Sequence, residues 1–147
     1  MEGVRIGSDC NIGDHVFIES GAVVGNGVTI KNNALIWKAV TIGDYVFIGP
    51  NVVFTNDRLP RSSKNPRIRD LKREEKEWLV PTTVLEGASL GANVTVVAGV
   101  TIGRYAMVGA GCVVSRNVPD FALVVGNPSR LIGWVNELGE RVERKQG

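Results

Sequence analysis

Few side chains in this 147-residue chain can act as a base, a nucleophile or a metal ligand. The sequence has one histidine, His15, and two cysteines, Cys10 and Cys112. A zinc site with three or four nitrogen or sulfur ligands does not fit within one such chain, and two cysteines do not make the disulfide framework of a small secreted protein. A catalytic triad with a histidine base would have to use His15. We therefore expect no metal centre and reduced thiols.

Positive charge is concentrated in one polar segment, residues 57–83. This segment has five acidic residues and eight of the 17 basic residues of the chain, which are Arg58, Arg61, Lys64, Arg67, Arg69, Lys72, Arg73 and Lys76. One interpretation is a solvated surface loop with a short helix over residues 70–78. A long basic loop on a rigid scaffold also suits a phosphorylated substrate, so we expect some of these arginines to contact a diphosphate. The net charge of +2 is too small to indicate nucleic acid binding.

The elements that must position these residues follow from a six-residue repeat. Stepping by six from Ile6 to Phe54, and again from Val84 to Val114, gives an apolar residue at all fifteen positions, where composition alone would give about seven. The fourth residue after each is small or β-branched, except Arg58, and Gly directly follows the apolar residue in eight repeats. Two or three such residues before a Gly, Asn or Asp bend are typical of a short strand. The repeat predicts a solenoid of short parallel strands around an aliphatic core.

The repeat also sets the organisation of the chain. Phe54 and Val84 are 30 residues, or five repeats, apart, so residues 57–83 are inserted without a change of phase. We expect one domain, residues 1–147, with coils over residues 4–56 and 84–118, an inserted loop over residues 57–83 and a C-terminal cap over residues 119–147. The cap would cover the unpaired strand edges of the solenoid end. No apolar run is long enough for a membrane span and no signal peptide is evident, so we expect a cytoplasmic protein without membrane insertion.

Several polar residues have a structural interpretation within the repeat. His15 takes the same place in its repeat as Tyr45 and Tyr105, which indicates a turn residue, and both cysteines lie in the inward row. One bend position that favours left-handed backbone is occupied by Asn33, Asn51, Asn93 and Asn117.

The repeats resemble the [Ile/Val/Leu]-Gly-x-x-[small]-x pattern of the hexapeptide-repeat acyltransferases. This resemblance covers residues 4–118 and implies an all-β fold, a left-handed parallel β-helix with three repeats per coil and therefore about five coils. Three stretches are more specific: VVFTNDRLPRS at residues 52–62, IKNN at residues 30–33, and residues 87–135. They resemble the N-acetyltransferases of this group that act on nucleotide-linked 3-amino sugars.

The resemblance implies residues for both substrates. In that family the asparagine that matches Asn56 hydrogen-bonds the attacking amine, and the IKNN face lies along the sugar. The residues expected to contact the nucleotide sugar are Asn32, Asn33, Trp37, Asp57, Arg58 and Arg61. The donor would be acetyl-CoA, which lies between two subunits in the family, so a homotrimer is implied. The residues expected to contact it are Ala92, Ala110, Arg116 and Arg130.

Three of these residues have alternative roles. Trp37 follows the inward Ile36, so alternation points it outward, where it would stack on a sugar or base or pack against a neighbouring subunit. Arg116 and Arg130 match positions suited to the phosphates of CoA, and the alternative for both is surface charge.

The shortage of histidine also bears on the chemistry. A sugar hydroxyl needs a positioned base, whereas an amine with electron-withdrawing neighbours has a pKa of roughly 7.7 to 8.0 and is about a tenth neutral at pH 7. We therefore favour an acetyl-CoA-dependent N-acetyltransferase that acts on a dTDP- or UDP-linked amino sugar. The alternatives are a non-catalytic scaffold that binds an acidic partner through the basic loop, and an acetyltransferase for another small amine. A γ-type carbonic anhydrase needs three histidines per metal site and is excluded.

Overall fold

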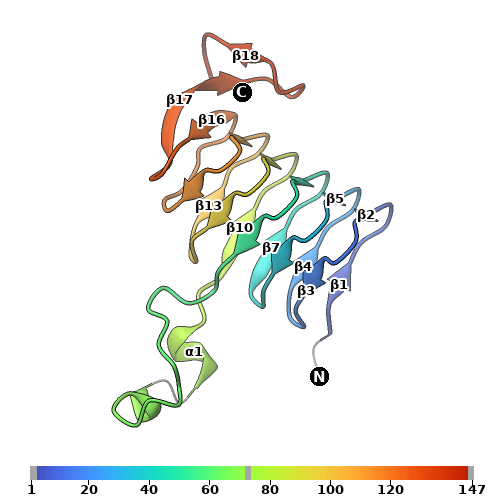
Figure 1. Cartoon of the computed structure of the whole chain (residues 1–147). Helices are drawn as coiled ribbons and strands as arrows, with labels where there is room; N and C mark the ends of the chain where they lie inside the picture. The colour runs from blue at the N-terminus through green and yellow to red at the C-terminus, as the bar shows by residue number, and fades with distance from the viewer. Residues whose placement is uncertain (1–2, 72–73, 146–147) are drawn as a thin grey trace.

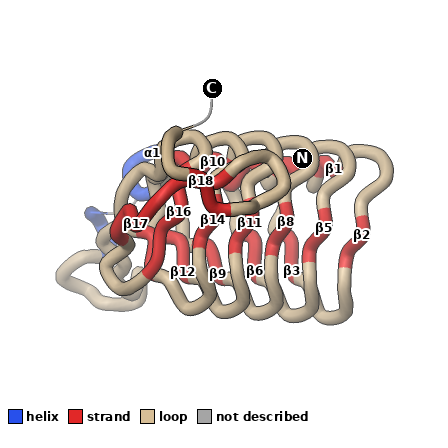
Figure 2. Tube along the Cα trace, turned by 90° about the horizontal axis from the view of Figure 1, so that it is seen from above, coloured by secondary structure: helices blue, strands red, loops and turns tan. Residues whose placement is uncertain are grey.

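The computed structural model describes residues 3–71 and 74–145 (Figure 1). The described chain has the expected all-β architecture, a left-handed parallel β-helix with almost no α-helix. Its coils form three sheets, and successive strands of the chain lie on successive sheets (Figure 2). Sheet A contains β1 (Arg5–Ile6), β4 (Val23–Val24), β7 (Val40–Ile42), β10 (Thr82–Val84) and β13 (Thr101–Ile102).

The other two sheets form the remaining sides of the β-helix. Sheet B contains β2 (Asn11–Ile12), β5 (Thr29–Ile30), β8 (Phe47–Ile48), β11 (Ser89–Leu90), β14 (Met107–Val108), β16 (Ala122–Val125), β17 (Arg130–Val135) and β18 (Arg141–Val142). Sheet C contains β3 (Phe17–Ile18), β6 (Leu35–Ile36), β9 (Val53–Phe54), β12 (Thr95–Val96) and β15 (Val113–Val114). Outside the inserted loop, each strand pairs in parallel with the strand 18 residues later, as Thr29 does with Phe47. One coil is therefore three repeats, as the resemblance implies.

The number of coils is slightly larger than expected. Sheets A and C have five parallel strands each, which makes five complete coils. A sixth coil begins with a bridge between Ile102 and Val118 and continues in β16, which pairs in parallel with β14. The coil thus extends past residue 118, where the cap was expected to begin, because Val118, Ala122 and Val124 are buried like the residues of earlier coils. Strands β17 and β18 then run antiparallel and extend sheet B at the C-terminal end (Figure 1).

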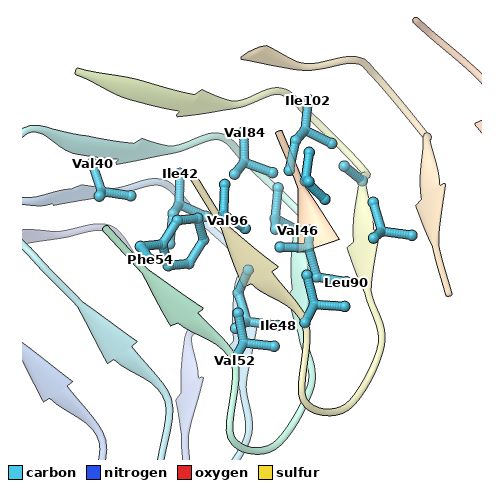
Figure 3. Packing of buried hydrophobic residues seen from close by; sticks show 14 of the residues in the cluster. Val40, Ile42, Val46, Ile48, Val52, Phe54, Val84, Leu90, Val96 and Ile102 are labelled. Carbon is cyan, nitrogen blue, oxygen red and sulfur yellow. The ribbon is translucent and has the colours of Figure 1, made fainter. Parts of the chain in front are cut away.

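The core is the aliphatic column that the repeat predicts. The twelve repeat positions from Val24 to Val114 are each at most 2% exposed. Figure 3 shows members from all three sheets, such as Ile42, Ile48 and Phe54, meeting inside one coil. At the N-terminal end the same repeat positions are open, and Ile6 and Ile12 are 44% and 39% exposed. Close packing of these side chains fixes the path of the strands and hence the direction of every turn.

The turns are made by residues that adopt the left-handed backbone region. His15, Asn33, Asn51 and Asn93 have φ between 58° and 65°, which confirms them as turn residues. Asn117 is not in this region; its side-chain oxygen instead accepts a hydrogen bond from the Thr101 amide at 2.8 Å.

The inserted loop leaves the coil after β9 and returns at β10. Figure 1 shows it projecting from the side of the β-helix. The short helix expected over residues 70–78 is present in part, as a 3₁₀ turn (Arg69–Leu71) and α1 (Glu75–Trp78), while Lys72 and Arg73 lie outside the described residues. In the described ranges no helix has the length and hydrophobicity of a membrane span.

Candidate functional site

The inserted loop starts and ends at the edge where the chain passes from sheet C to sheet A, which we call edge CA. The register of sheet C stacks four residues of this edge in successive coils, in the order Lys38, Asn56, Ala98 and Arg116. Asn56 is the second residue after β9 and lies where the regular coil gives way to the loop. The segment that looked most specific in the sequence is therefore at the one edge that departs from the regular solenoid.

The side chain of Asn56 has a defined orientation. Its Nδ2 donates a hydrogen bond to the carbonyl oxygen of Lys38 at 3.3 Å, and its own carbonyl oxygen accepts from the amide of Val80 at 2.9 Å. A carbonyl oxygen can only accept, so the amide nitrogen of Asn56 must face Lys38. This leaves Oδ1 as an acceptor, and none of the described residues donates to it. The half-buried Asn56 can therefore accept a hydrogen bond from a ligand N–H group.

Lys38 is a residue of this edge that the sequence analysis missed. Its amide donates to Glu19 Oε2 at 2.8 Å, its carbonyl oxygen accepts from Asn56, and its Nζ forms an ion pair with Glu75 Oε1 at 2.6 Å. Lys38 thus connects the coil below, the amide of Asn56 and helix α1 of the loop. The signal that could have identified it was its separation of 18 residues, one coil, from Asn56.

The residues that follow Asn56 mostly contact the backbone. Asp57 Oδ1 accepts a hydrogen bond from the Leu59 amide at 2.8 Å, which forms a local turn. The guanidinium of Arg58 donates from Nε to the carbonyl oxygen of Ala98 at 3.0 Å, and Arg61 is exposed and bonds the neighbouring Pro60 carbonyl oxygen. Of the predicted sugar-nucleotide contacts, these three lie on the same edge as Asn56.

Trp37 also lies on edge CA, but it is less exposed than alternation predicts. Its ring is half-buried, packs against the core and contacts the ring of Phe17 with the centroids 5.1 Å apart and the planes tilted by 57°. The neighbouring coil supplies this contact, and alternation within one strand does not show it.

The other predicted contacts lie on the edge between sheets B and C, which we call edge BC. Asn32 Oδ1 accepts from the Asp14 amide at 3.1 Å, and Asn33 is the left-handed turn residue beside it. Ala92 and Ala110 lie on the same edge in adjacent coils, as their spacing predicts, and the carbonyl oxygen of Ala92 accepts from the Gly111 amide at 2.8 Å. The width of sheet C separates these four residues from Asn56, so one chain does not bring the two predicted sets together.

Next to Ala110 the outer surface of sheet B is hollowed. An apolar groove of about 370 Å³ is lined by Phe47, Ser89, Leu90, Gly91, Met107, Val108, Gly109 and Ala110. The groove is narrow enough and apolar enough for an extended chain with few polar atoms. The two arginines predicted to meet CoA phosphates are both exposed but are apart, since Arg116 lies on edge CA and Arg130 begins β17.

Residues 3–71 and 74–145 contain no group of three or more His, Cys, Asp or Glu side chains that could hold a metal ion. His15 is in the first coil, on edge BC, and is not beside Asn56. Cys112 is fully buried, and this burial raises the pKa of its thiol. The described residues therefore place neither an imidazole nor a reactive thiol next to Asn56.

Two family models of hexapeptide repeats match the coils. "Bacterial transferase hexapeptide (six repeats)" matches residues 21–56 and 81–116, and "Hexapeptide repeat of succinyl-transferase" matches residues 3–38. Together they cover residues 3–56 and 81–116, which is more than half of the chain. The segment between them is the inserted loop.

Curated relatives include several acetyltransferases. The chain is 61% identical over 54 residues to a dTDP-3-amino-3,6-dideoxy-alpha-D-galactopyranose 3-N-acetyltransferase of Aneurinibacillus thermoaerophilus, a match that covers 37% of this chain and 28% of that protein. It is 30% identical over 95 residues to the galactoside O-acetyltransferase of Escherichia coli, covering 65% of this chain and 44% of that protein. The chain thus spans less than half the length of either relative.

Solved structures share the fold over most of the chain. A hexapeptide-repeat acetyltransferase of Vibrio cholerae, complexed with acetyl coenzyme A, has a TM-score of 0.75 and 27% identity over 90% of this chain and 71% of that chain. A mutant GDP-perosamine N-acetyl transferase of Caulobacter crescentus, in complex with CoA and GDP-perosamine, has a TM-score of 0.71 and 26% identity over 90% of this chain and 52% of that chain. From the repeat, the three-sheet coil and these matches, the chain belongs to the family of hexapeptide-repeat transferases.

Proposed function

We propose that this protein is an acetyl-CoA-dependent N-acetyltransferase that acts on the amino group of a nucleotide-linked amino sugar, with a dTDP- or UDP-linked 3-amino sugar favoured. The observation that carries the proposal is the orientation of Asn56, whose Oδ1 is left to accept a hydrogen bond while Nδ2 is held by the carbonyl oxygen of Lys38. The high identity to a relative named as a 3-N-acetyltransferase of a dTDP-linked amino sugar supports the same choice.

The proposed reaction needs an oriented amine more than a strong base. Asn56 Oδ1 accepts one N–H of the neutral amine and directs the nitrogen lone pair at the thioester carbonyl carbon. The C–N bond forms, the tetrahedral intermediate collapses with cleavage of the C–S bond, and the departing sulfur takes the proton that the nitrogen loses. The products are an amide and CoA with a free thiol. Backbone amides that face the developing oxyanion would lower the barrier further.

The residues near Asn56 favour an amine over a hydroxyl as the acceptor. A sugar hydroxyl is a much weaker acid than an ammonium group with a pKa near 8 and needs a positioned base to become nucleophilic. The only histidine of the chain is His15, which lies in the first coil on a different edge. This argument separates the protein from a galactoside O-acetyltransferase, to which the chain is also similar.

The separation of the two edges supports a homotrimer. Asn56, Trp37, Asp57 and Arg61 are on edge CA, where we place the sugar nucleotide, whereas Ala92 and Ala110 are on edge BC beside the apolar groove. We place the pantetheine arm of acetyl-CoA along edge BC of one subunit, facing edge CA of the next. Asn32, Asn33, Arg116 and Arg130 would then border the same intersubunit site, the two arginines toward the CoA phosphates.

The test is thiol release from acetyl-CoA with a panel of acceptors, measured for the native protein and for Asn56→Ala. The panel contains 3-amino and 4-amino sugars linked to dTDP and UDP, with galactosides and serine as other acceptor classes. The native protein should release thiol only with amino sugars. Asn56→Ala should lower kcat by roughly 100-fold and leave KM within about threefold, because orientation is lost while most binding contacts remain.

Asn11→Ala is the matched control, because Asn11 is an exposed asparagine in the first coil, and it should keep native activity. Asn56→Asp keeps the acceptor oxygen but places a carboxylate against the Lys38 carbonyl oxygen, so it should also lose activity. Absence of thiol release with every amino sugar would overturn the proposal. If CoA and nucleotide sugars also left the melting temperature unchanged, the alternative of a non-catalytic scaffold would be favoured.

A further inference from the structure

The turn Ala98–Gly99, one coil above Asn56, holds the point where the inserted loop leaves and re-enters the coil. Its two amides are bound by threonine hydroxyls: Ala98 N–H donates to Thr55 Oγ1 and Gly99 N–H donates to Thr82 Oγ1, both at 3.0 Å. Thr55 directly precedes Asn56, and Thr82 is the first residue of β10, where the loop ends. The amides of this turn therefore bind both ends of the loop.

The two carbonyl oxygens of the same turn are bound by one side chain of the loop. Arg58 donates from Nε to the Ala98 oxygen at 3.0 Å and from Nη2 to the Gly99 oxygen at 3.5 Å. All four backbone polar groups of the turn are thus used to hold the loop, which we call the loop clamp (Thr55, Arg58, Thr82, Ala98 and Gly99). A planar fork of N–H donors is needed to reach two carbonyl oxygens at once, and arginine is the side chain that supplies it.

Gly99 is shaped to receive this side chain. Its φ is +90°, and a Cβ atom built on it would collide with Nη2 of Arg58. Arg58 is also the one residue that breaks the row of small and β-branched residues in the sequence repeat. The break in the repeat and the open space over Gly99 therefore have one cause, the seat of the guanidinium.

Asn56 lies within the clamp, between Thr55 and Arg58, and its carbonyl oxygen bonds Val80 on the returning strand. We infer that Arg58 is a positioning residue for Asn56, acting by clamping the loop to the next coil, and that a contact with substrate phosphate is not its main role. This inference rests on the proposed function. It differs from the expectation from sequence, because the structure gives the guanidinium two backbone partners.

Steady-state kinetics of Arg58→Ala and a double-mutant cycle with Asn56→Ala test the inference. Arg58→Ala should lower kcat about 10- to 100-fold with KM for the nucleotide sugar within about threefold, since misplacement of a positioning group by 1 Å costs this much. In the Asn56→Ala background the same change should lower kcat less than about twofold. Arg58→Lys should recover only part of the rate. A raised KM with unchanged kcat, or full additivity in the cycle, would overturn the inference.

A second readout does not depend on activity. Hydrogen exchange of the peptides that contain Val80 and Ala98–Gly99 should become at least several-fold faster in Arg58→Ala. The control is Arg104→Ala, which removes an exposed arginine from the edge between sheets A and B and should leave this exchange unchanged. If the native protein released no thiol, the proposed function would fail while faster exchange still supported the clamp. Unchanged exchange in Arg58→Ala would overturn the clamp whatever the activity.

Discussion

At the scale of single residues, the glycine that follows an apolar repeat position allows a polar side chain of the next coil to come close. Asn26, Asn32, Asp44 and Asp120 each accept, through Oδ1, a backbone N–H one coil below at 2.8 to 3.1 Å. The glycines just before these donors are Gly7, Gly13, Gly25 and Gly103, and a Cβ on any of them would collide with an accepting residue. Close approach of side chain to backbone, and not a special φ, is the reason for glycine at these positions.

The buried thiol of Cys112 gives a prediction at this scale. Burial raises its pKa, so the folded thiol stays protonated at pH values where the unfolded thiol, with an ordinary pKa of about 8.5, loses its proton. The folded protein then binds more protons, and stability should fall as pH rises above about 8.5. Urea denaturation of the native protein and of Cys112→Ala across pH 7.5 to 10 should show a shallower decline for the variant. Equal slopes would contradict the prediction.

At the scale of elements, helix α1 is held to the coil by a charged contact. Glu75 in its first turn pairs with Lys38, and the two side chains are 44% and 37% exposed. Ion pairs of this exposure contribute about 0 to 1 kcal/mol, so the pair adds little to global stability. Its effect is local, because Lys38 is also the residue whose carbonyl oxygen orients Asn56. The loop is thus attached on both sides of Asn56, by Arg58 above and by Lys38 below.

Glu75→Gln should loosen the loop without lowering the melting temperature by more than about 2 °C. Limited trypsin digestion measures the change, since the loop has many basic residues, and cleavage within residues 57–79 should be several-fold faster. Glu74→Gln is the matched control, because Glu74 pairs only with Lys76 of the same helix among the described contacts. The difference should shrink in about 1 M salt, which screens the Lys38–Glu75 attraction. Equal cleavage of the two variants would show that the pair does not restrain the loop.

At the scale of the whole molecule, equivalent repeat positions differ because the two ends of the β-helix differ. The C-terminal end continues into a sixth coil and the antiparallel strands β17 and β18, and Val135 of β17 is fully buried. The N-terminal coil of the described chain has no coil below it. Ile6 and Ile48 occupy the same place in the repeat, yet Ile6 is 44% exposed and Ile48 is fully buried.

The comparison of Ile48→Ala with Ile6→Ala tests this gradient. Ile48→Ala should lower the free energy of unfolding by about 2 to 5 kcal/mol, because it leaves a cavity in the closed part of the core. Ile6→Ala removes the same atoms from a partly exposed site and should cost less than about 1.5 kcal/mol. Urea denaturation of both variants measures the two losses. Equal losses would mean that the first coil is covered in solution.

Much of this architecture could be predicted from sequence because a regular solenoid uses local and periodic interactions. The six-residue spacing specifies which side chains face inward, and the 18-residue coil then places Ala92 beside Ala110 and Lys38 beside Asn56. The sixth coil was less evident, since Val118, Ala122 and Val124 do not continue the earlier phase. The half-buried state of Trp37 was also missed, because it depends on Phe17 in another coil.

By itself, the sequence determined the parallel coil, its aliphatic core, the position of the inserted loop and a shortage of histidine that favours an amine acceptor. It did so because period and composition act on each repeat alike. Only the tertiary structure decided how the irregular residues are used. It turned the amide of Asn56 by means of the Lys38 carbonyl oxygen, and it bound Arg58 to the Ala98–Gly99 turn. These contacts join segments of different coils across an insertion without a repeat, so no spacing in the sequence specifies them.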